Sequence, residues 1–200
     1  WEFVVFDEDA TINAFALPGG RVIVTVGMLQ FVKNDDELAV VLGHEIAHVV
    51  ARHGAEKMSG QLVGQLVAAL TGGFVNSVAL WSIFFTVSSE LPASRLMETE
   101  ADFIGLHLSA KAGFCPHHAP SFWMRLAVAQ QGKTPHKFLS THPPSSERSM
   151  ELERHLPQLI PLYIQARNQW PLWLRIYPDL FPRCKRCSTM NSSAPQQQQQ

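Results

Sequence analysis

The sequence predicts one α+β domain that is mostly helical and has a small β-sheet or hairpin at its N-terminal end. Two short β-rich runs lie within the first 26 residues, and helix-compatible stretches follow them along the chain. The chain has 200 residues, 46% of them hydrophobic, so it can bury a core of ordinary size. Its net charge of −1 gives no indication of a nucleic-acid partner.

The two β-rich runs are residues 2–6 (EFVVF) and 21–26 (RVIVTV), and the Pro-Gly-Gly sequence at 18–20 requires a turn between them. The segment before this turn could form an exposed edge of the sheet; its residues are Asn13, Ala14, Phe15 and Ala16. Such an edge is useful to a protease, because an extended substrate can pair with it through main-chain hydrogen bonds. A hairpin that only covers the core explains the same sequence equally well.

A turn or short helix is expected over residues 27–32, and a long helix from about residue 35 to about residue 58. Asn34 is a good N-cap for the long helix, and the three acidic residues after it suit the positive end of the helix dipole. Apolar residues, among them Val41 and Ile46, are expected to pack this helix into the core.

The long helix contains the sequence His44-Glu45-Ile46-Ala47-His48. Residues four apart on a helix project from one face, so His44 and His48 can bind one zinc ion together. Glu45 can take a proton from a water molecule activated by that ion, which is the chemistry of a hydrolase. The alternative is a solvated pair of histidines beside a surface glutamate, which the apolar flanking residues disfavour.

The third metal ligand is expected on a later helix, over residues 95–112, where Glu98 and Asp102 share one face. Glu98 is the expected ligand, and Asp102 can accept a hydrogen bond from a ligating imidazole. A merely acidic helix face is the alternative. A rival zinc pattern, with a Gly and a third His after the first pair, is excluded because Ala51 and Gly54 occupy those positions.

Other polar residues receive weaker assignments. His53 lies off the face of the histidine pair and is expected to be structural, Glu100 is expected to be solvated, and His117-His118 is expected to be a solvated loop pair. His142 lies in a loop constrained by two prolines, from which it could approach the metal and donate to a developing oxyanion.

The segment between the two metal-binding helices has an unusual composition. Residues 58–89 contain no charged residue, and residues 62–87 are apolar enough to cross a bilayer. The Gly72-Gly73 pair and scattered polar residues favour two shorter apolar helices instead. These helices could contact a membrane or form a soluble hairpin, and both interpretations stay open.

The C-terminal half is expected to contain three more helices, over residues 119–131, 147–156 and 159–170. The tail at 176–200 ends in five glutamines and is expected to be disordered, so the folded domain should cover residues 1–175. The chain begins at Trp1 without an initiator Met or a secretory apolar region, so we expect a fragment or a processed product.

Three cysteines, Cys115, Cys184 and Cys187, are too few and too uneven to predict a disulfide framework. The Cys184-x-x-Cys187 spacing is only a weak indication of a metal or redox site.

Four motifs, in this order along the chain, resemble the M48 family of zinc metallopeptidases. They are residues 13–20 (NAFALPGG), 42–48 (LGHEIAH), 98–102 (ETEAD) and 140–144 (STHPP). The resemblance covers roughly residues 10–155 and implies a zincin-type α+β metalloendopeptidase fold. It also implies one zinc ion bound by His44, His48 and Glu98, with Glu45 as the general base.

Within the family, the motifs are most similar to a mitochondrial inner-membrane branch. This similarity implies membrane contact and cleavage of membrane proteins in stress response and quality control. A soluble periplasmic-type protease with a chaperone function, or a non-catalytic membrane scaffold that keeps the fold, are the alternatives. Homo-oligomerisation is also left open.

Overall fold

The computed structural model describes residues 1–60, 62, 91–130, 138, 142, 146–171, 174, 182, 184 and 187. The apolar segment at 62–87, apart from residue 62, and the tail at 176–200, apart from residues 182, 184 and 187, lie outside the described residues, so the expectations for them stay predictions. In the described part of the chain, no helix combines the length and the apolar character that a membrane span requires.

The N-terminal sheet has three strands, β1 (Glu2–Phe6), β2 (Ala14–Leu17) and β3 (Arg21–Thr25), in the order β1-β3-β2. β1 runs parallel to β3 and β2 runs antiparallel to it, so both expected β-rich runs are strands. The turn between β2 and β3 uses Gly19 and Gly20 at φ values of 98° and 87°, where a side chain would be strained. β2 lies at an edge of the sheet, and no other strand in the described part of the chain pairs with its outer side.

Two helices follow the sheet, α1 (Val26–Phe31) and α2 (Asp35–Val50). The Asn34 side chain accepts a hydrogen bond from the Glu37 N–H at 2.9 Å, which confirms the expected N-cap of α2. The expectation that this helix continues to about residue 58 is wrong. The chain leaves α2 at Val50, Arg52 adopts a left-handed φ of 59°, and a separate helical stretch begins at residue 53. Neither Gly nor Pro occupies positions 50–53, and the nearest glycine, Gly54, comes after the turn.

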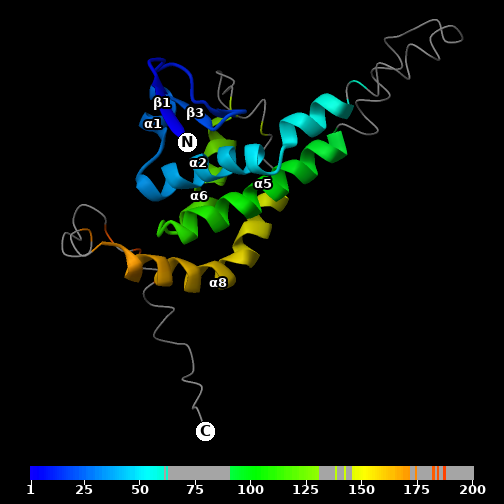
Figure 1. Ribbon diagram of the computed structural model, residues 1–200. Helices are drawn as coiled ribbons and strands as arrows, with labels where there is room; N and C mark the ends of the chain where they lie inside the picture. The colour runs from blue at the N-terminus through cyan, green and yellow to red at the C-terminus, as the bar shows by residue number, and fades with distance from the viewer. Residues whose placement is uncertain are drawn as a thin grey trace, which may run out of the picture.

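The remaining long helices are α5 (Leu91–Lys111), α6 (His118–Gln130) and α8 (Ser146–Gln169). α5 begins four residues earlier than expected, with the proline of position 92 in its first turn, where this residue is tolerated. α8 is one bent helix rather than the two expected, and Figure 1 shows its change of direction. Its two internal prolines each remove one backbone donor, while buried residues on both sides keep the helix packed on the core.

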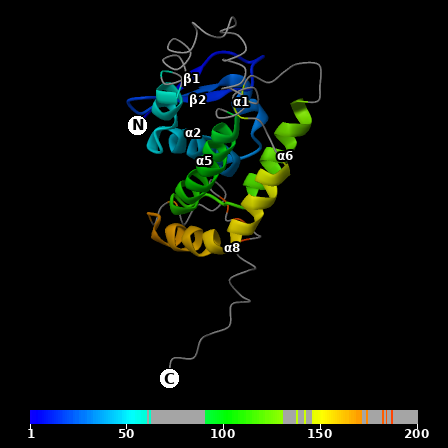
Figure 2. The ribbon, with the colours of Figure 1, turned by 90° about the vertical axis from the view of Figure 1, so that its right-hand side faces the viewer.

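The packing of α2 against α5 positions the site, and both views show these two helices together (Figures 1 and 2). Their backbones meet at two glycines, where a Cβ on Gly43 would lie 2.6 Å from Gly105 O and one on Gly105 would lie 2.6 Å from His44 N. Only glycine permits this approach, which brings the histidines of α2 against the acidic face of α5. The surrounding core includes Phe122, Phe138, Leu126, Val41 and Met28.

Candidate metal centre

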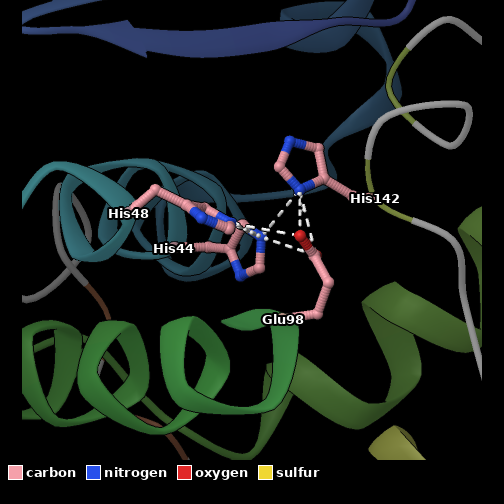
Figure 3. A group of neighbouring side chains, drawn as sticks. All are labelled: His44, His48, Glu98 and His142. Carbon is pink, nitrogen blue, oxygen red and sulfur yellow. Dashed lines mark hydrogen bonds and ion pairs between the residues drawn. The ribbon is translucent and has the colours of Figure 1, made fainter. Parts of the chain in front are cut away.

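Four side chains from three parts of the chain converge at the junction of α2 and α5 (Figure 3). His44 and His48 come from α2, Glu98 from α5, and His142 from the segment before α8. The Nε2 atoms of His44 and His48 are 3.1 Å apart, and His142 Nδ1 lies 3.2 Å from His44 Nε2. The Glu98 carboxylate lies 3.0 Å from His142 Nδ1 and 3.4 Å from each of the other two rings.

These separations fit a metal ion. A tetrahedral zinc ion with ligand bonds of about 2.0–2.1 Å places neighbouring ligand atoms about 3.3 Å apart. The four inward atoms lie 3.0–3.4 Å apart in the contacts given above, and three of them are imidazole nitrogens. Imidazole and carboxylate donors suit zinc, and the four inward atoms all lie within 4.8 Å of one another.

The outer nitrogen of His44 is held by a buried ion pair. His44 Nδ1 lies 3.0 Å from Asp102 Oδ1, the residue that was expected to support a ligating imidazole. Asp102 in turn accepts hydrogen bonds from Arg148 Nε at 2.6 Å and Arg148 Nη2 at 2.9 Å, and Arg148 Nη1 lies 3.3 Å from Glu98. Arg148 was not singled out from the sequence. Its partners are 46 and 50 residues away, so no local spacing links it to them. Its place just after the proline-rich motif was the one feature that could have drawn attention to it.

Burial and charge shift the pKa values of the cluster in opposite directions. Burial disfavours protonation of His44, but Asp102 and Glu98 outweigh it and raise the pKa of His44 to about 9. Burial, with the nearby charge of His44, lowers the pKa of His48 to about 2. Burial opposes ionisation of Glu98, yet His142 and His44 hold the pKa of that carboxyl well below its usual range. Glu98 is therefore a carboxylate and His48 a neutral imidazole, as a metal site requires, whereas His44 must release its extra ring proton when the ion binds.

Glu45 is buried beside the cluster, 3.5 Å from His142 Nε2. Burial raises the pKa of its carboxyl, which moves it toward the range of a general base at neutral pH. A hydrogen bond from the backbone of Ala16 on β2 lowers the pKa of Glu45 and so opposes the effect of burial. Glu45 therefore lies between the metal cluster and the edge strand. Within the described residues, Glu45 Oε1 has no hydrogen-bond partner, which leaves an acceptor for a water molecule or a substrate.

His142 lies deeper than the sequence suggested. It was expected to approach the metal and assist an oxyanion, and its Nδ1 instead lies among the ligand atoms. The ring packs on Phe138, with centroids 4.7 Å apart, and Phe138 stacks on Trp123. The structure thus adds a fourth donor to the three predicted.

The edge segment is only partly available to a partner. Asn13 precedes β2, and its N–H already donates to Thr25 Oγ1 at 3.0 Å. Ala14 is buried, whereas Phe15 is 38% exposed and Ala16 is half-buried. A substrate could therefore pair with the outer side of β2 from Phe15 onward more readily than at Asn13.

The structure gives further contacts to three residues around the site. His53 is outside the group of four candidate ligands, and the turn at Arg52 brings its Nδ1 to 2.9 Å from His48 Nδ1, the ring nitrogen that faces away from that group. Glu100 is exposed as expected, and it also lies 3.3 Å from His53 Nε2. His118 is not simply solvated, because its Nε2 lies 3.5 Å from Asp36 near the start of α2.

The cysteines are also closer together than expected. The structure joins Cys115 to Cys184 as a disulfide, and Cys187 Sγ lies 3.2 Å from Cys115 Sγ. Cys115 and Cys184 are 69 positions apart, so spacing gave no indication of this pairing. The bond ties a segment beyond α8 to the loop between α5 and α6.

Comparisons with known proteins agree with this geometry. Residues 1–156 match the model of peptidase family M48. The mitochondrial metalloendopeptidase OMA1 of Saccharomyces cerevisiae is 38% identical over 172 residues, which cover 83% of this chain and 50% of that protein. The OMA1 of Schizosaccharomyces pombe is 44% identical over 161 residues, covering 79% and 47%. The beta-barrel assembly-enhancing protease of Escherichia coli is 28% identical over 184 residues, covering 86% and 38%. The chain thus spans about half the length of its yeast relatives.

Proposed function

The chain belongs to peptidase family M48, and from that premise we propose that it is a zinc-dependent metalloendopeptidase acting in mitochondrial protein quality control. The observation that carries the proposal is the group of four donor atoms 3.0–3.4 Å apart beside the buried Glu45. The mostly helical α+β architecture with a small N-terminal sheet supports it, since M48 enzymes are zincin-like.

His44, His48 and Glu98 would hold the zinc ion, with His142 as a fourth donor. The ion, when bound, supplies Lewis acidity to a water molecule and to the scissile carbonyl. Glu45 then takes a proton from the water and returns it to the leaving amine, for which its raised pKa is suited. Asp102 and Arg148 orient His44 from behind, because Asp102 contacts the ring nitrogen that faces away from the other ligands.

The outer side of β2 would hold the substrate in an extended conformation. The contact between Glu45 and the Ala16 backbone supports this, since a peptide paired with β2 would pass directly over the general base. Main-chain pairing selects for extended peptides more than for particular side chains. We therefore propose that the place where the enzyme is held, rather than the sequence of the peptide, selects its substrates. The proposed substrate class is membrane proteins at the mitochondrial inner membrane.

Membrane contact through residues 62–87 is part of the proposal. The bacterial periplasm is the alternative location, and the mechanism proposed here operates equally in a monomer and in a homo-oligomer. Carbonate extraction of the full-length protein tests the membrane contact. If residues 62–87 embed in lipid, the wild-type protein stays in the membrane pellet, and a variant lacking them shifts toward the supernatant.

The enzymatic proposal is tested with Glu45→Gln. The variant should still bind one zinc ion, because Glu45 is not in the ligand group, and should lose chelator-sensitive proteolysis. Cleavage at the wild-type rate would refute the assigned base. A peptide with a blocked N-terminus separates an endopeptidase, which cuts it, from an aminopeptidase, which does not. Zinc binding without any cleavage by the wild-type protein would favour a non-catalytic scaffold.

A further inference from the structure

Each histidine of the metal cluster contacts a different partner with its outer nitrogen. His44 Nδ1 faces Asp102, and His142 Nε2 faces Glu45. His48 Nδ1 faces His53 Nδ1 at 2.9 Å. Asp102 and Glu45 already have assigned roles in the proposed reaction, whereas His53 has none.

His53 is positioned for this contact by an unusual backbone. Its side chain is 2% exposed, and its Nε2 lies 3.3 Å from Glu100 Oε2 on α5. Glu100 is 58% exposed, so the contacts lead from the metal cluster to solvent. The left-handed conformation of Arg52 turns the chain back toward His48, and a non-glycine residue in that region costs about 1 kcal/mol or more.

One arrangement of protons satisfies every contact in this series. If His48 Nε2 binds the metal, the ring proton is on Nδ1, from which it is donated to His53 Nδ1. His53 Nδ1 must then be an acceptor, so the proton of His53 is on Nε2. That N–H points to Glu100, a carboxylate that accepts it. Both rings are neutral in this arrangement, and no donor faces another donor.

We propose that His53 and Glu100 are positioning residues for the metal centre. Glu100 fixes the tautomer of His53, and His53 fixes the tautomer and the ring orientation of His48. The inference rests on the proposed function, since it requires that His48 binds zinc through Nε2. It explains why a polar ring is buried where an apolar residue would fill the same space, and why the chain adopts a strained turn to place it there.

Two substitutions at position 53 separate hydrogen bonding from packing. The amide of Asn lies at the same distance from the backbone as Nδ1 of His, so His53→Asn can present an acceptor to His48. The amide of Gln corresponds to Nε2, so His53→Gln keeps a group near Glu100 and loses the acceptor facing His48. Gln is closer to His in volume, so a role in packing alone predicts that Gln replaces His better than Asn does.

The measurement is the rate at which the zinc-loaded full chain releases zinc to an excess of chelator. We expect His53→Gln to release zinc about 10–100-fold faster than the wild type, and His53→Asn to stay within about threefold. The visible spectrum of the cobalt-substituted protein should change in the Gln variant and be retained in the Asn variant. His107→Gln, on α5 with its ring bonded to Phe103 O, is the matched control and should change neither.

Glu100→Ala tests the outer contact with His53 left in place, so it does not depend on how position 53 variants fold. It should release zinc faster than Glu153→Ala, an exposed carboxylate on α8. Equal rates for these two variants, or a Gln variant at position 53 that holds zinc as well as the Asn variant, would overturn the inference. A wild-type protein that binds no zinc would instead overturn the proposed function.

Discussion

The buried Arg148 offers the sharpest test of how the site is built. Arg148 and Asp102 are 7% and 4% exposed, and two hydrogen bonds of 2.6 and 2.9 Å join them. Arg148→Met keeps the length of the side chain and removes the charge, which leaves the protonated His44 ring as the cation beside Asp102 in place of a doubly bonded guanidinium. Removing one partner of a buried ion pair costs about 3–5 kcal/mol, a large share of the roughly 5–15 kcal/mol that stabilises a domain.

The assay is urea unfolding of the metal-free protein at pH 7, which gives the free energy of unfolding. Arg154→Met is the control, because Arg154 pairs with Glu151 at 3.0 Å on the surface and is 75% exposed. Such a pair contributes less than about 1 kcal/mol. Adding Asp102→Asn to Arg148→Met should recover part of the loss, because the buried carboxylate that lost its guanidinium is then gone. A loss below about 1 kcal/mol for Arg148→Met would refute this account of the site.

Three further predictions follow from the same geometry. The free energy of unfolding of the metal-free protein should fall as pH rises from about 6.5 through 9, because the raised pKa of His44 stabilises the fold only while that ring is protonated. It should also fall as pH drops below about 6.5, because the lowered pKa of His48 stabilises the fold only while that ring is neutral. Urea titrations across pH in the presence of a chelator measure both effects. Gly105→Ala should destabilise the protein by about 1–3 kcal/mol or more and lower zinc occupancy, since the added Cβ would meet the backbone of His44. Gly54→Ala is the control, because open space surrounds Gly54, and equal melting temperatures for the two variants would contradict the prediction. Reduction of the Cys115–Cys184 bond should lower stability by about 4 kcal/mol for a loop of 69 residues, and an unchanged melting temperature with a reducing agent would count against the pairing.

Local patterns in the sequence account for most of the elements. The β-rich runs, the glycine turn and the Asn34 cap depend on neighbouring residues, and each is present in the structure. The end of α2 at Val50 and the continuity of α8 through its prolines were not predictable in the same way. Propensity is a weak prior, and packing of distant residues decides whether a helix ends or bends.

The donor residues of the metal centre show the same contrast between what neighbouring residues determine and what the packing of distant residues determines. Helical spacing alone places His44 and His48 on one face, and Glu98 and Asp102 on another. The role of each as a ligand or a support stays a prediction, while their convergence is a property of the fold. Nothing local indicated that Arg148 would pair with Asp102, or that His142 would lie among the ligands rather than above them.

By itself, the sequence determined which chemical groups are present and how each helix displays them, because the periodicity of a helix is a local property of the backbone. Only the tertiary structure decided which faces meet, because that depends on the close approach of α2 and α5 at Gly43 and Gly105 and on the turn at Arg52. Because the two backbones can approach closely only where both residues are glycine, this contact fixes the position of α2 along α5. That position sets which histidine faces which carboxylate. Burial of His53 against His48 offsets the cost of the left-handed turn, and no spacing rule describes this contact.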